Sequence, residues 1–488
     1  MQYLTTKQKD SIGFTFITQL IKPVSPYGRE ALRRIEPYRP GQEDALNLEL
    51  QNIAKTLKVR PHLESEYLKL EQEMGLTRGI RGSIERIGQE LSEVDLFEIK
   101  RFLIQLKQIT ELFEIINKEA DYNNIVIDPA APALKLLDPE NSAVATFHIS
   151  NRNFPVLAEI RAQKKEVERK LREDPRSSDI DLLIAERSVL ASKEQAQEQY
   201  AMQWLSAKLM PWRDILRSNA DMIGCLDISL QKAKLAIIYT SCMPEITDGV
   251  ISFHDMLSPS LESILSDSGR RFTPLTMEVR AGTTVITGAN MGGKSVALKT
   301  LALNVLLIQY GFYPFATKAE CPLLDSIHMI SDDLEAADRG LSSFGGEIVA
   351  LQEVLSEIED SRSLVLLDEF ARGTNPVEGG AIARGVCAYM NKQKAFTVMT
   401  THYEGVAALA GVHYQVAGLR KLALDDEFME EIRNASTSER ITIIASYMDY
   451  GLIRVSADEK LPQDALNICR LLDLHAEIIE LIESPRPL

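Results

Sequence analysis

The chain contains few of the residues that build disulfide frameworks or zinc sites. Its 488 residues include five cysteines and seven histidines, and neither a CxxC nor an HxxxH pair occurs. An odd number of scattered cysteines argues against a disulfide framework and against a zinc site, and indicates the reduced thiols of a cytoplasmic protein.

Long apolar runs are also missing. The longest uncharged stretch, 300–317, is interrupted by Asn304, Gln309, Gly311 and Pro314. It therefore falls short of the ~18 continuous apolar residues that cross a membrane. The N-terminus has no apolar core like that of a signal peptide. We expect a cytoplasmic protein without a membrane partner.

Positive charge is scarce as well. The chain has 54 basic and 70 acidic residues, a formal charge of −16, which excludes a global positive field that would hold nucleic acid. The acidity is uneven, because 281–488 contain 17 basic and 29 acidic residues whereas 1–280 contain 37 and 41. Charge alone therefore does not exclude DNA at the front half, although no interleaving of basic and aromatic residues marks a groove there.

The pattern of hydrophobic residues differs between the front and the back of the chain. Apolar residues recur at three- and four-residue steps through the first ~120 residues, which predicts helices. Two amphipathic stretches, 154–173 and 180–240, flank the turn signal at 174–179 and predict an antiparallel arm or two helices of one bundle. After Pro244, short apolar runs at 283–287, 363–367 and 395–400 alternate with helical segments. That pattern predicts a parallel sheet with crossover helices.

The strongest motif fits the phosphate-binding pattern G-x-x-x-x-G-K-[ST] in full. A predicted strand enters it and an apolar helix leaves it, so successive backbone N–H groups and the helix N-terminus would face phosphates. Lys294 would bridge the β- and γ-phosphates of ATP, and Ser295 would bind Mg²⁺. The motif consists of Gly288, Ala289, Asn290, Met291, Gly292, Gly293, Lys294 and Ser295.

Two carboxylates follow the strand predicted at 363–367. Asp368 would lie at its C-terminal end, where ligands of open α/β sheets bind, and would hold Mg²⁺ directly or through water. Glu369 would orient or deprotonate the attacking water. The sequence therefore predicts ATP hydrolysis rather than nucleotide binding alone.

Two further segments are candidates for the same site. His402 follows the strand predicted at 395–400, at the same sheet edge, where an imidazole would sense the γ-phosphate. Ser342 lies in a Ser/Gly turn that opens a helix, another anion-binding N-terminus, and would act on nucleotide bound by a partner subunit.

These segments together resemble the MutS ATPase family. GANMGGKS is similar to its phosphate loop, SLVLLDEFARGTNPVEGG to its acidic strand and following loop, TTHY to its histidine motif and GLSSFGGE to its Ser-Thr-Phe signature. Ala371 replaces a glycine of the family loop. The resemblance is close over about 274–405 and weaker in the front half, where IGFTFITQLIKPVSPYGREALRRIEP resembles the start of the helical core in shorter members.

The resemblance implies an α plus α/β fold. A helical core and lever arm over 1–240, with the clamp reduced to about 174–200, would precede an ABC-type P-loop ATPase domain with a mainly parallel sheet over 245–488. The domain would form a homodimer or a heterodimer with a related subunit, and Ser342 would complete the ATP site of the partner. C-terminal helices with Leu466, Cys469, Leu472, Ile478, Ile479 and Ile482 would either strap the dimer or pack as ordinary core.

Departures from the family leave the target open. We expect no N-terminal domain with a Phe-x-Glu wedge ahead of the core, little room for a clamp, and no nuclease-type domain before Leu488. One hypothesis is a mismatch-repair-like protein that binds mispaired or branched DNA. The other is a reactivating factor for an adenosylcobalamin-dependent aminomutase, because short MutS-like subunits of such factors look similar. A nucleotide-binding scaffold without turnover is disfavoured by Glu369 and His402.

Overall fold

The computed structural model divides the chain into two compact units. Unit 1 comprises 1–21, 36–51 and 234–488, and unit 2 comprises 22–35 and 52–233. The structure describes residues 3–122, 124–145, 149–173, 179–267, 269–288, 293–331, 343–359, 361–418, 426–436, 439–440, 443–444, 447–455 and 464–483.

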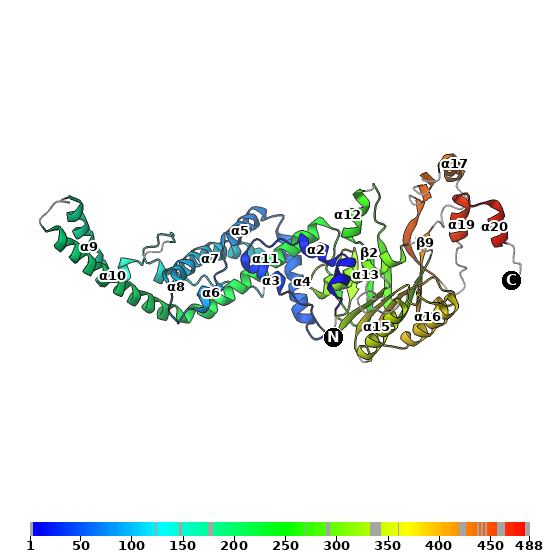
Figure 1. Cartoon of the computed structure of the whole chain (residues 1–488), viewed down its shortest axis with the longest axis horizontal. Coiled ribbons are helices and arrows are strands. Elements are labelled where there is room, and N and C mark those ends of the chain that lie inside the picture. The colour runs from blue at the N-terminus through cyan, green and yellow to red at the C-terminus, as the bar shows by residue number, and fades with distance from the viewer. Residues whose placement is uncertain are drawn as a thin grey trace. The chain divides into compact units, whose positions relative to one another are not determined.

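Unit 2 is helical throughout its described part (Figure 1). Its longest core helix is α7, which begins with a capping box at Ser92 and buries Leu103, Leu106 and Ile109 along one face. The predicted helical front half is thus confirmed, and the connector expected around 128–139 contains the short helix α8. The helices of unit 2, with α4 and α11 shared with unit 1, are α3 (Pro26–Arg33), α4 (Glu43–Val59), α5 (Glu64–Leu76), α6 (Arg81–Glu85), α7 (Glu93–Ala120), α8 (Ala131–Leu137), η1 (Asn151–Asn153), α9 (Pro155–Glu173), α10 (Ile180–Leu209), η2 (Met210–Trp212) and α11 (Arg213–Ile238).

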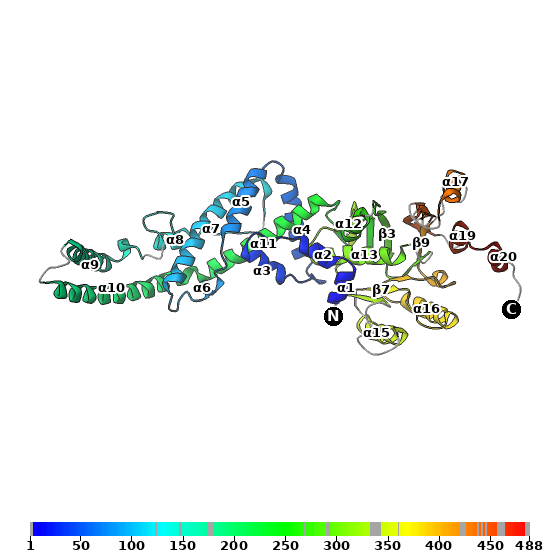
Figure 2. The same ribbon diagram turned by 45° about the horizontal axis from the view of Figure 1, so that its top comes forward.

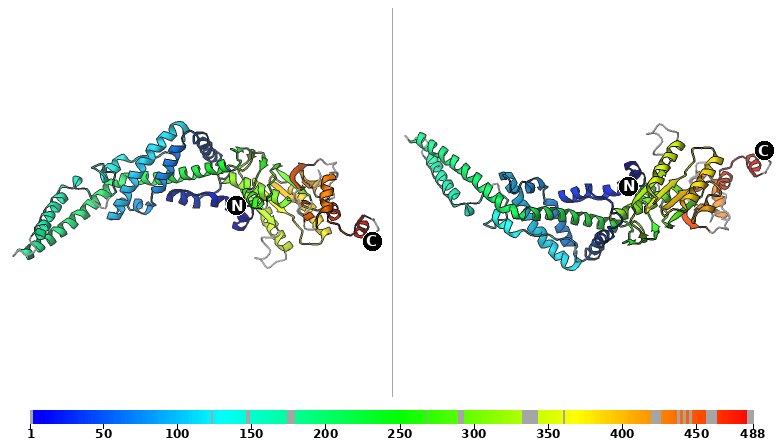
Figure 3. Two further views of the ribbon diagram at one scale, coloured as in Figure 1. Left: turned by 90° about the horizontal axis from the view of Figure 1, so that it is seen from above. Right: turned by 90° about the horizontal axis from the view of Figure 1, so that it is seen from below.

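Helices α9 and α10 form an antiparallel hairpin, as Figure 3 shows in both views. Arg161 of α9 donates hydrogen bonds to Glu194 and Glu198 of α10, at 3.2 and 2.8 Å. Lys164 adds an ion pair to Glu194 at 2.5 Å. The arm predicted from the two amphipathic stretches is therefore present. The second stretch is not one helix, because Pro211 lies in the 3₁₀ turn between α10 and α11.

Unit 1 contains two sheets among its described residues. The larger has the strand order β10-β9-β4-β8-β7-β6, parallel except for β10. The smaller has the order β1-β5-β2-β3, in which only β1 and β5 run parallel. The strands are β1 (Glu245–Ile246), β2 (Val250–Met256), β3 (Leu275–Arg280), β4 (Gly282–Thr287), β5 (Lys318–Cys321), β6 (Ser326–Ser331), β7 (Ser363–Asp368), β8 (Phe396–Thr400), β9 (Val412–Gly418) and β10 (Asp449–Arg454).

Helices cover the larger sheet on both faces, which explains why β4, β7 and β8 read as continuous apolar runs. α13 lies above β7, and α15 and α16 lie below it in Figure 2. An α/β mix with mostly parallel strands is thereby confirmed. The helices of unit 1 are α1 (Thr6–Ser11), α2 (Phe14–Leu20), α12 (Pro259–Asp267), α13 (Lys294–Gln309), α15 (Ser343–Glu357), α16 (Pro376–Met390), η3 (Ala407–Leu409), α17 (Asp426–Asn434), α19 (Asp464–Leu471) and α20 (Ala476–Glu483).

Candidate nucleotide-binding site

The turn between β4 and α13 requires two glycines in unusual conformations. Gly288 has φ 141° and Gly293, the N-cap of α13, has φ 86°. A Cβ at Gly288 would lie 3.2 Å from Cβ of Val416, and one at Gly293 would lie 3.2 Å from Cδ1 of Tyr450. Both positions thus favour glycine sterically as well as conformationally. Four predicted loop residues, Ala289, Asn290, Met291 and Gly292, lie outside the described residues.

Lys294 opens α13 with its side chain buried to 2% exposure. Its ammonium donates to the carbonyl oxygen of Gly288 at 2.9 Å and pairs with Oε1 of Glu369 at 3.3 Å. A buried ammonium requires such partners, because an unpaired one would lose its hydration. The predicted loop lysine and the predicted carboxylate base are therefore brought together.

Asp368 is the last residue of β7, and one of its carboxylate oxygens accepts hydrogen bonds from two hydroxyl groups. The Oγ of Ser295 donates to its Oδ1 at 2.8 Å, and the Oγ1 of Thr400 donates to the same oxygen at 2.7 Å. The predicted Mg²⁺ ligands, Ser295 and Asp368, thus lie in direct contact. An uncharged hydroxyl beside a carboxylate is a hard-oxygen donor set, the chemistry that Mg²⁺ prefers.

Glu369 follows with a left-handed backbone, φ 48°, which is uncommon for a residue other than glycine. Its N–H donates to Oγ1 of Thr400 at 2.8 Å, and its Oε2 accepts from Arg372 at 2.8 Å. With Lys294 on its other oxygen, the carboxylate lies between two cations.

His402 follows β8 and has an exposed side chain. Partial desolvation lowers its pKa; the nearby carboxylate of Glu369 opposes this shift, and the ammonium of Lys294 adds to it. His402 is therefore close enough to Glu369 and Lys294 for their charges to affect its pKa. Ser342, the predicted partner-site residue, lies outside the described residues.

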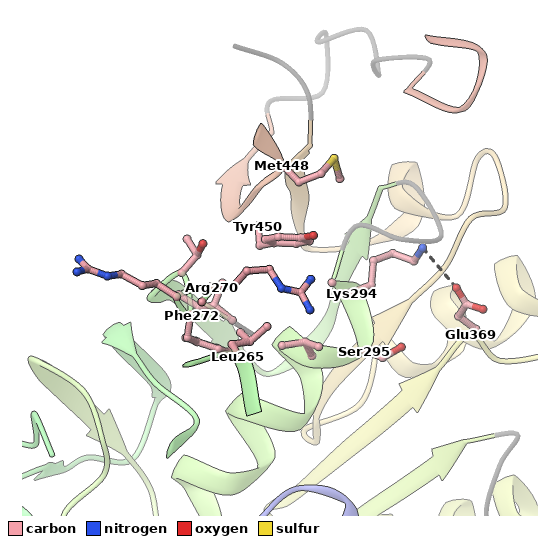
Figure 4. Close-up of a pocket in the computed structure, with 14 residues that line it drawn as sticks. Leu265, Arg270, Phe272, Lys294, Ser295, Glu369, Met448 and Tyr450 are labelled. Carbon is pink, nitrogen blue, oxygen red and sulfur yellow. Dashed lines mark ion pairs between the residues drawn. The ribbon is translucent and has the colours of Figure 1, made fainter. Parts of the chain in front are cut away.

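A pocket of about 640 Å³ adjoins the start of α13. Lys294 and Glu369 lie toward one end, and the ring of Tyr450 and the side chain of Arg270 lie toward the other (Figure 4). Ligand pockets have about this size and combine apolar walls with a few polar groups. The lining residues are Leu265, Gly269, Arg270, Arg271, Phe272, Thr273, Leu275, Gly293, Lys294, Ser295, Val296, Glu369, Met448 and Tyr450.

Several site residues have no motif that reveals them in the sequence. Tyr450 lines the pocket from β10, far from the phosphate loop in the sequence, and Arg270 lines it from the loop between α12 and β3. Thr400 is the first residue of the TTHY motif, in which the sequence singles out only the histidine as a candidate site residue. Arg372 lies three residues after Glu369, a spacing that favours a local ion pair but does not specify one.

Two properties concern the described residues as a whole. Within them, no group of three or more histidine, cysteine, aspartate or glutamate side chains is arranged to hold a metal ion. None of the helices described is long and apolar enough to cross a membrane.

Comparison with known proteins agrees with this geometry. Residues 284–472, which contain the end of β4, the acidic strand β7 and the His402 segment, match the family model of MutS domain V. Over this range the chain is similar to a domain of the MutS family, and the resemblance to that family predicted from the sequence is confirmed.

Similar proteins include several named endonuclease MutS2. The one from Enterococcus faecalis is 25% identical over 389 residues, which are 72% of this chain and 49% of the relative. That from Leuconostoc mesenteroides subsp. mesenteroides is 27% identical over 364 residues, 72% of this chain and 42% of the relative. That from Ruminiclostridium cellulolyticum is 32% identical over 202 residues, 40% and 24% of the two chains. The chain spans about half the length of the first two relatives. Together these findings support a MutS-family protein.

Proposed function

We propose that this chain is a MutS-family ATPase that converts ATP and water to ADP and phosphate at the turn between β4 and α13. The observation that carries the proposal is the contact of Ser295 with Asp368 beside the Lys294–Glu369 ion pair. A loop lysine, a hydroxyl, and two carboxylates at one sheet edge form the set that phosphoryl transfer requires.

Each side chain has a distinct role in the proposal. Lys294 and the N-terminus of α13 bind the phosphates, and the pocket beside Tyr450 receives the base and sugar. Ser295 and Asp368 hold Mg²⁺, which when bound supplies positive charge to the phosphate oxygens. His402 contacts the γ-phosphate.

Glu369 accepts a proton from the attacking water. Its carboxylate is paired with Lys294 and Arg372 in the structure, and these two contacts hold it at the edge of the site. Phosphate oxygens compete for the ammonium of Lys294, which frees Oε1 of Glu369 for water. Binding of the substrate thus prepares the base.

The test is ATP turnover by the wild-type chain and by Glu369→Gln. A positioned general base contributes about 10²–10⁴-fold, so we expect turnover to fall by about that factor while nucleotide affinity is retained. Unchanged turnover in Glu369→Gln would exclude Glu369 as the base. Absence of Mg²⁺-dependent turnover in the wild type would refute the ATPase itself.

We further propose that two copies, or this chain and a related subunit, close around ATP and that Ser342 of each completes the site of the other. The γ-phosphate is the differential contact between closed and open states. Closure and release would move the helical arms, α9 and α10.

Mispaired or branched DNA is the target we favour, because similar proteins are named endonucleases. The experiment measures ATPase rates with homoduplex, mismatched and four-way-junction DNA at two salt concentrations. Stimulation that falls steeply with salt supports DNA, since phosphate contacts release counterions.

A protein client, such as a cobalamin-dependent aminomutase, is the alternative. The observation that favours it is the brevity of the hairpin turn: α9 ends at Glu173 and α10 begins at Ile180. That interval leaves no room for a clamp domain. ATPase rates that ignore every DNA but rise with an inactivated aminomutase would select this alternative.

A further inference from the structure

One buried hydroxyl joins the two carboxylate residues of the candidate site. Thr400, whose side chain is 0% exposed, donates from Oγ1 to Oδ1 of Asp368 at 2.7 Å. The Oγ1 of Thr400 also accepts a hydrogen bond from the backbone N–H of Glu369, at 2.8 Å. The hydroxyl of Thr400 therefore contacts both carboxylate residues at once: it bonds to the side chain of Asp368 and to the backbone N–H of Glu369.

The order of strands explains why this position can serve as a link. β8 lies between β4, which leads to the phosphate loop, and β7, which ends at Asp368. Ile286 of β4 pairs with Thr400, and Leu367 of β7 pairs with Met399. The last residue of β8 is thus the one whose side chain meets the end of β7 at the edge where Gly288 follows β4.

Both bonds constrain groups that need constraint. Glu369 has φ 48°, a conformation that non-glycine residues adopt only when neighbouring contacts hold it. The Oδ1 of Asp368 accepts hydrogen bonds from the hydroxyls of Ser295 and Thr400, and these two bonds fix the orientation of the carboxylate.

We propose that Thr400 is a positioning residue for the hydrolytic step. Its hydroxyl fixes the backbone of Glu369, and with it the carboxylate that receives the proton, and it fixes the rotamer of Asp368. It touches neither water nor nucleotide itself. This inference rests on the proposed ATPase function and assigns to the first threonine of the TTHY motif a role separate from that of His402.

The chain offers a matched control on the same strand. Thr397 also lies in β8 and is also 0% exposed, but its hydroxyl makes no hydrogen bond with the described residues. Thr→Val keeps the shape of the side chain and removes only the hydroxyl. Comparing Thr400→Val with Thr397→Val therefore isolates the two hydrogen bonds of Thr400 from the effect of a valine in the strand.

The experiment measures kcat, KM for ATP, and the affinity of a fluorescent ATP analogue with and without Mg²⁺, together with the thermal unfolding temperature. For Thr400→Val we expect kcat to fall by about 10–100-fold, because a misplacement of ~1 Å at a catalytic group costs on the order of 10²-fold. Analogue affinity without Mg²⁺ should stay unchanged, and the increase in affinity produced by Mg²⁺ should shrink. Thr400→Ser, which restores the hydroxyl, should recover kcat to within about threefold.

Three outcomes would overturn the inference. Equal kcat values for Thr400→Val and Thr397→Val would show that the hydroxyl positions nothing. Failure of Thr400→Ser to recover kcat would assign the effect to side-chain volume. If Thr400→Val had a much lower unfolding temperature and also lost nucleotide binding without Mg²⁺, the fall in kcat would be due to a disrupted structure. A wild-type chain without turnover would refute the proposed function instead.

Discussion

At the scale of the residue, Lys294 is the side chain that we propose as the main determinant of nucleotide binding. Both the motif and the structure place its ammonium at the phosphate turn, 2.9 Å from the carbonyl oxygen of Gly288. Replacement by Ala should reduce ATP affinity by at least about 10-fold, since a charge-assisted bond contributes about 1.5–3 kcal/mol. Isothermal titration with ATP and Mg²⁺ measures this.

The control for that measurement lies on the same helix. Lys299 of α13 is partly exposed and does not line the pocket. Lys299→Ala should bind ATP as the wild type does. If Lys294→Ala also bound ATP normally, the assignment of the phosphate loop would be wrong.

Arg372 is the second cation on Glu369, at 2.8 Å from Oε2. Its side chain is 58% exposed, so screening by water makes its contribution to stability small. We therefore expect Arg372→Ala to leave the unfolding temperature within about 1 °C and to lower kcat modestly, by about two- to fivefold. A large loss of stability in a denaturation experiment would mean that the pair is structural.

How far residues could be predicted depends on whether a local pattern encodes them. Asp368 and Ser295 were predictable because an apolar strand and a glycine turn each deliver a side chain to a known edge of a sheet. Tyr450 and Arg270 were not, because only tertiary folding brings β10 and the loop after α12 to the pocket. The hydroxyl of Thr400 needed the strand order, which periodicity does not contain.

At the scale of elements, the hairpin of α9 and α10 depends on one half-buried ion cluster. Glu194 accepts bonds from both Arg161 and Lys164, and its side chain is 15% exposed. Glu194→Ala would leave two cations with fewer partners, so we expect unit 2 to lose about 1–2 kcal/mol of unfolding free energy. Chemical denaturation monitored by hydrogen exchange at α9 would measure it.

An exposed ion pair on α9 provides the comparison. Glu173 pairs with Arg169, and their side chains are 60% and 54% exposed. Surface pairs contribute about 0–1 kcal/mol, so Glu173→Ala should change stability much less. Equal losses for the two variants would contradict the view that burial gives the Glu194 cluster its strength.

The larger sheet carries a pH dependence through β9. His413 bonds to Oγ1 of Thr287 at 2.8 Å, and burial lowers its pKa below the ordinary value of 6.5. Below pH 6.5 the unfolded chain binds a proton at this histidine more readily than the folded chain does. The stability that the neutral ring contributes is therefore fully present above pH 6.5 and is lost as the pH falls toward the lower pKa of the folded state. His413→Gln keeps a hydrogen-bonding group without titrating. Its unfolding temperature should fall less than that of the wild type between pH 7.5 and 5.5; parallel curves would contradict the assignment.

Elements were predictable where their periodicity was unambiguous. The runs at 283–287, 363–367 and 395–400 correspond to β4, β7 and β8, because burial on both faces makes such strands uniformly apolar. β9, with its central Tyr414-Gln415, and β10, with its Tyr450-Gly451, lack that signature. α8 was missed because Pro129 and Pro132 read as a break, whereas Pro132 occupies an early helical position, which a helix tolerates.

At the scale of the whole molecule, the chain passes between its two units after residues 21, 35, 51 and 233. The change in hydrophobic periodicity predicts a single domain boundary near 240–245. The segments 1–21 and 36–51 are helical, so composition groups them with the front half, whereas their contacts group them with 234–488. Long-range contacts of this kind, such as the bond of Tyr3 to the carbonyl of Leu324 at 2.7 Å, leave no periodic trace in a sequence.

The proposed dimer makes a prediction that only a two-subunit site satisfies. Lys294→Ala removes a subunit's own phosphate site but leaves its Ser342 available to a partner, and Ser342→Ala does the reverse. Each variant alone should therefore be inactive. In an equal mixture about half of the dimers are mixed, and each mixed dimer contains one complete site, so ATPase activity should return to about one quarter of the wild-type rate. If Ser342 acted within its own subunit, or the chain worked as a monomer, the mixture would be as inactive as its components.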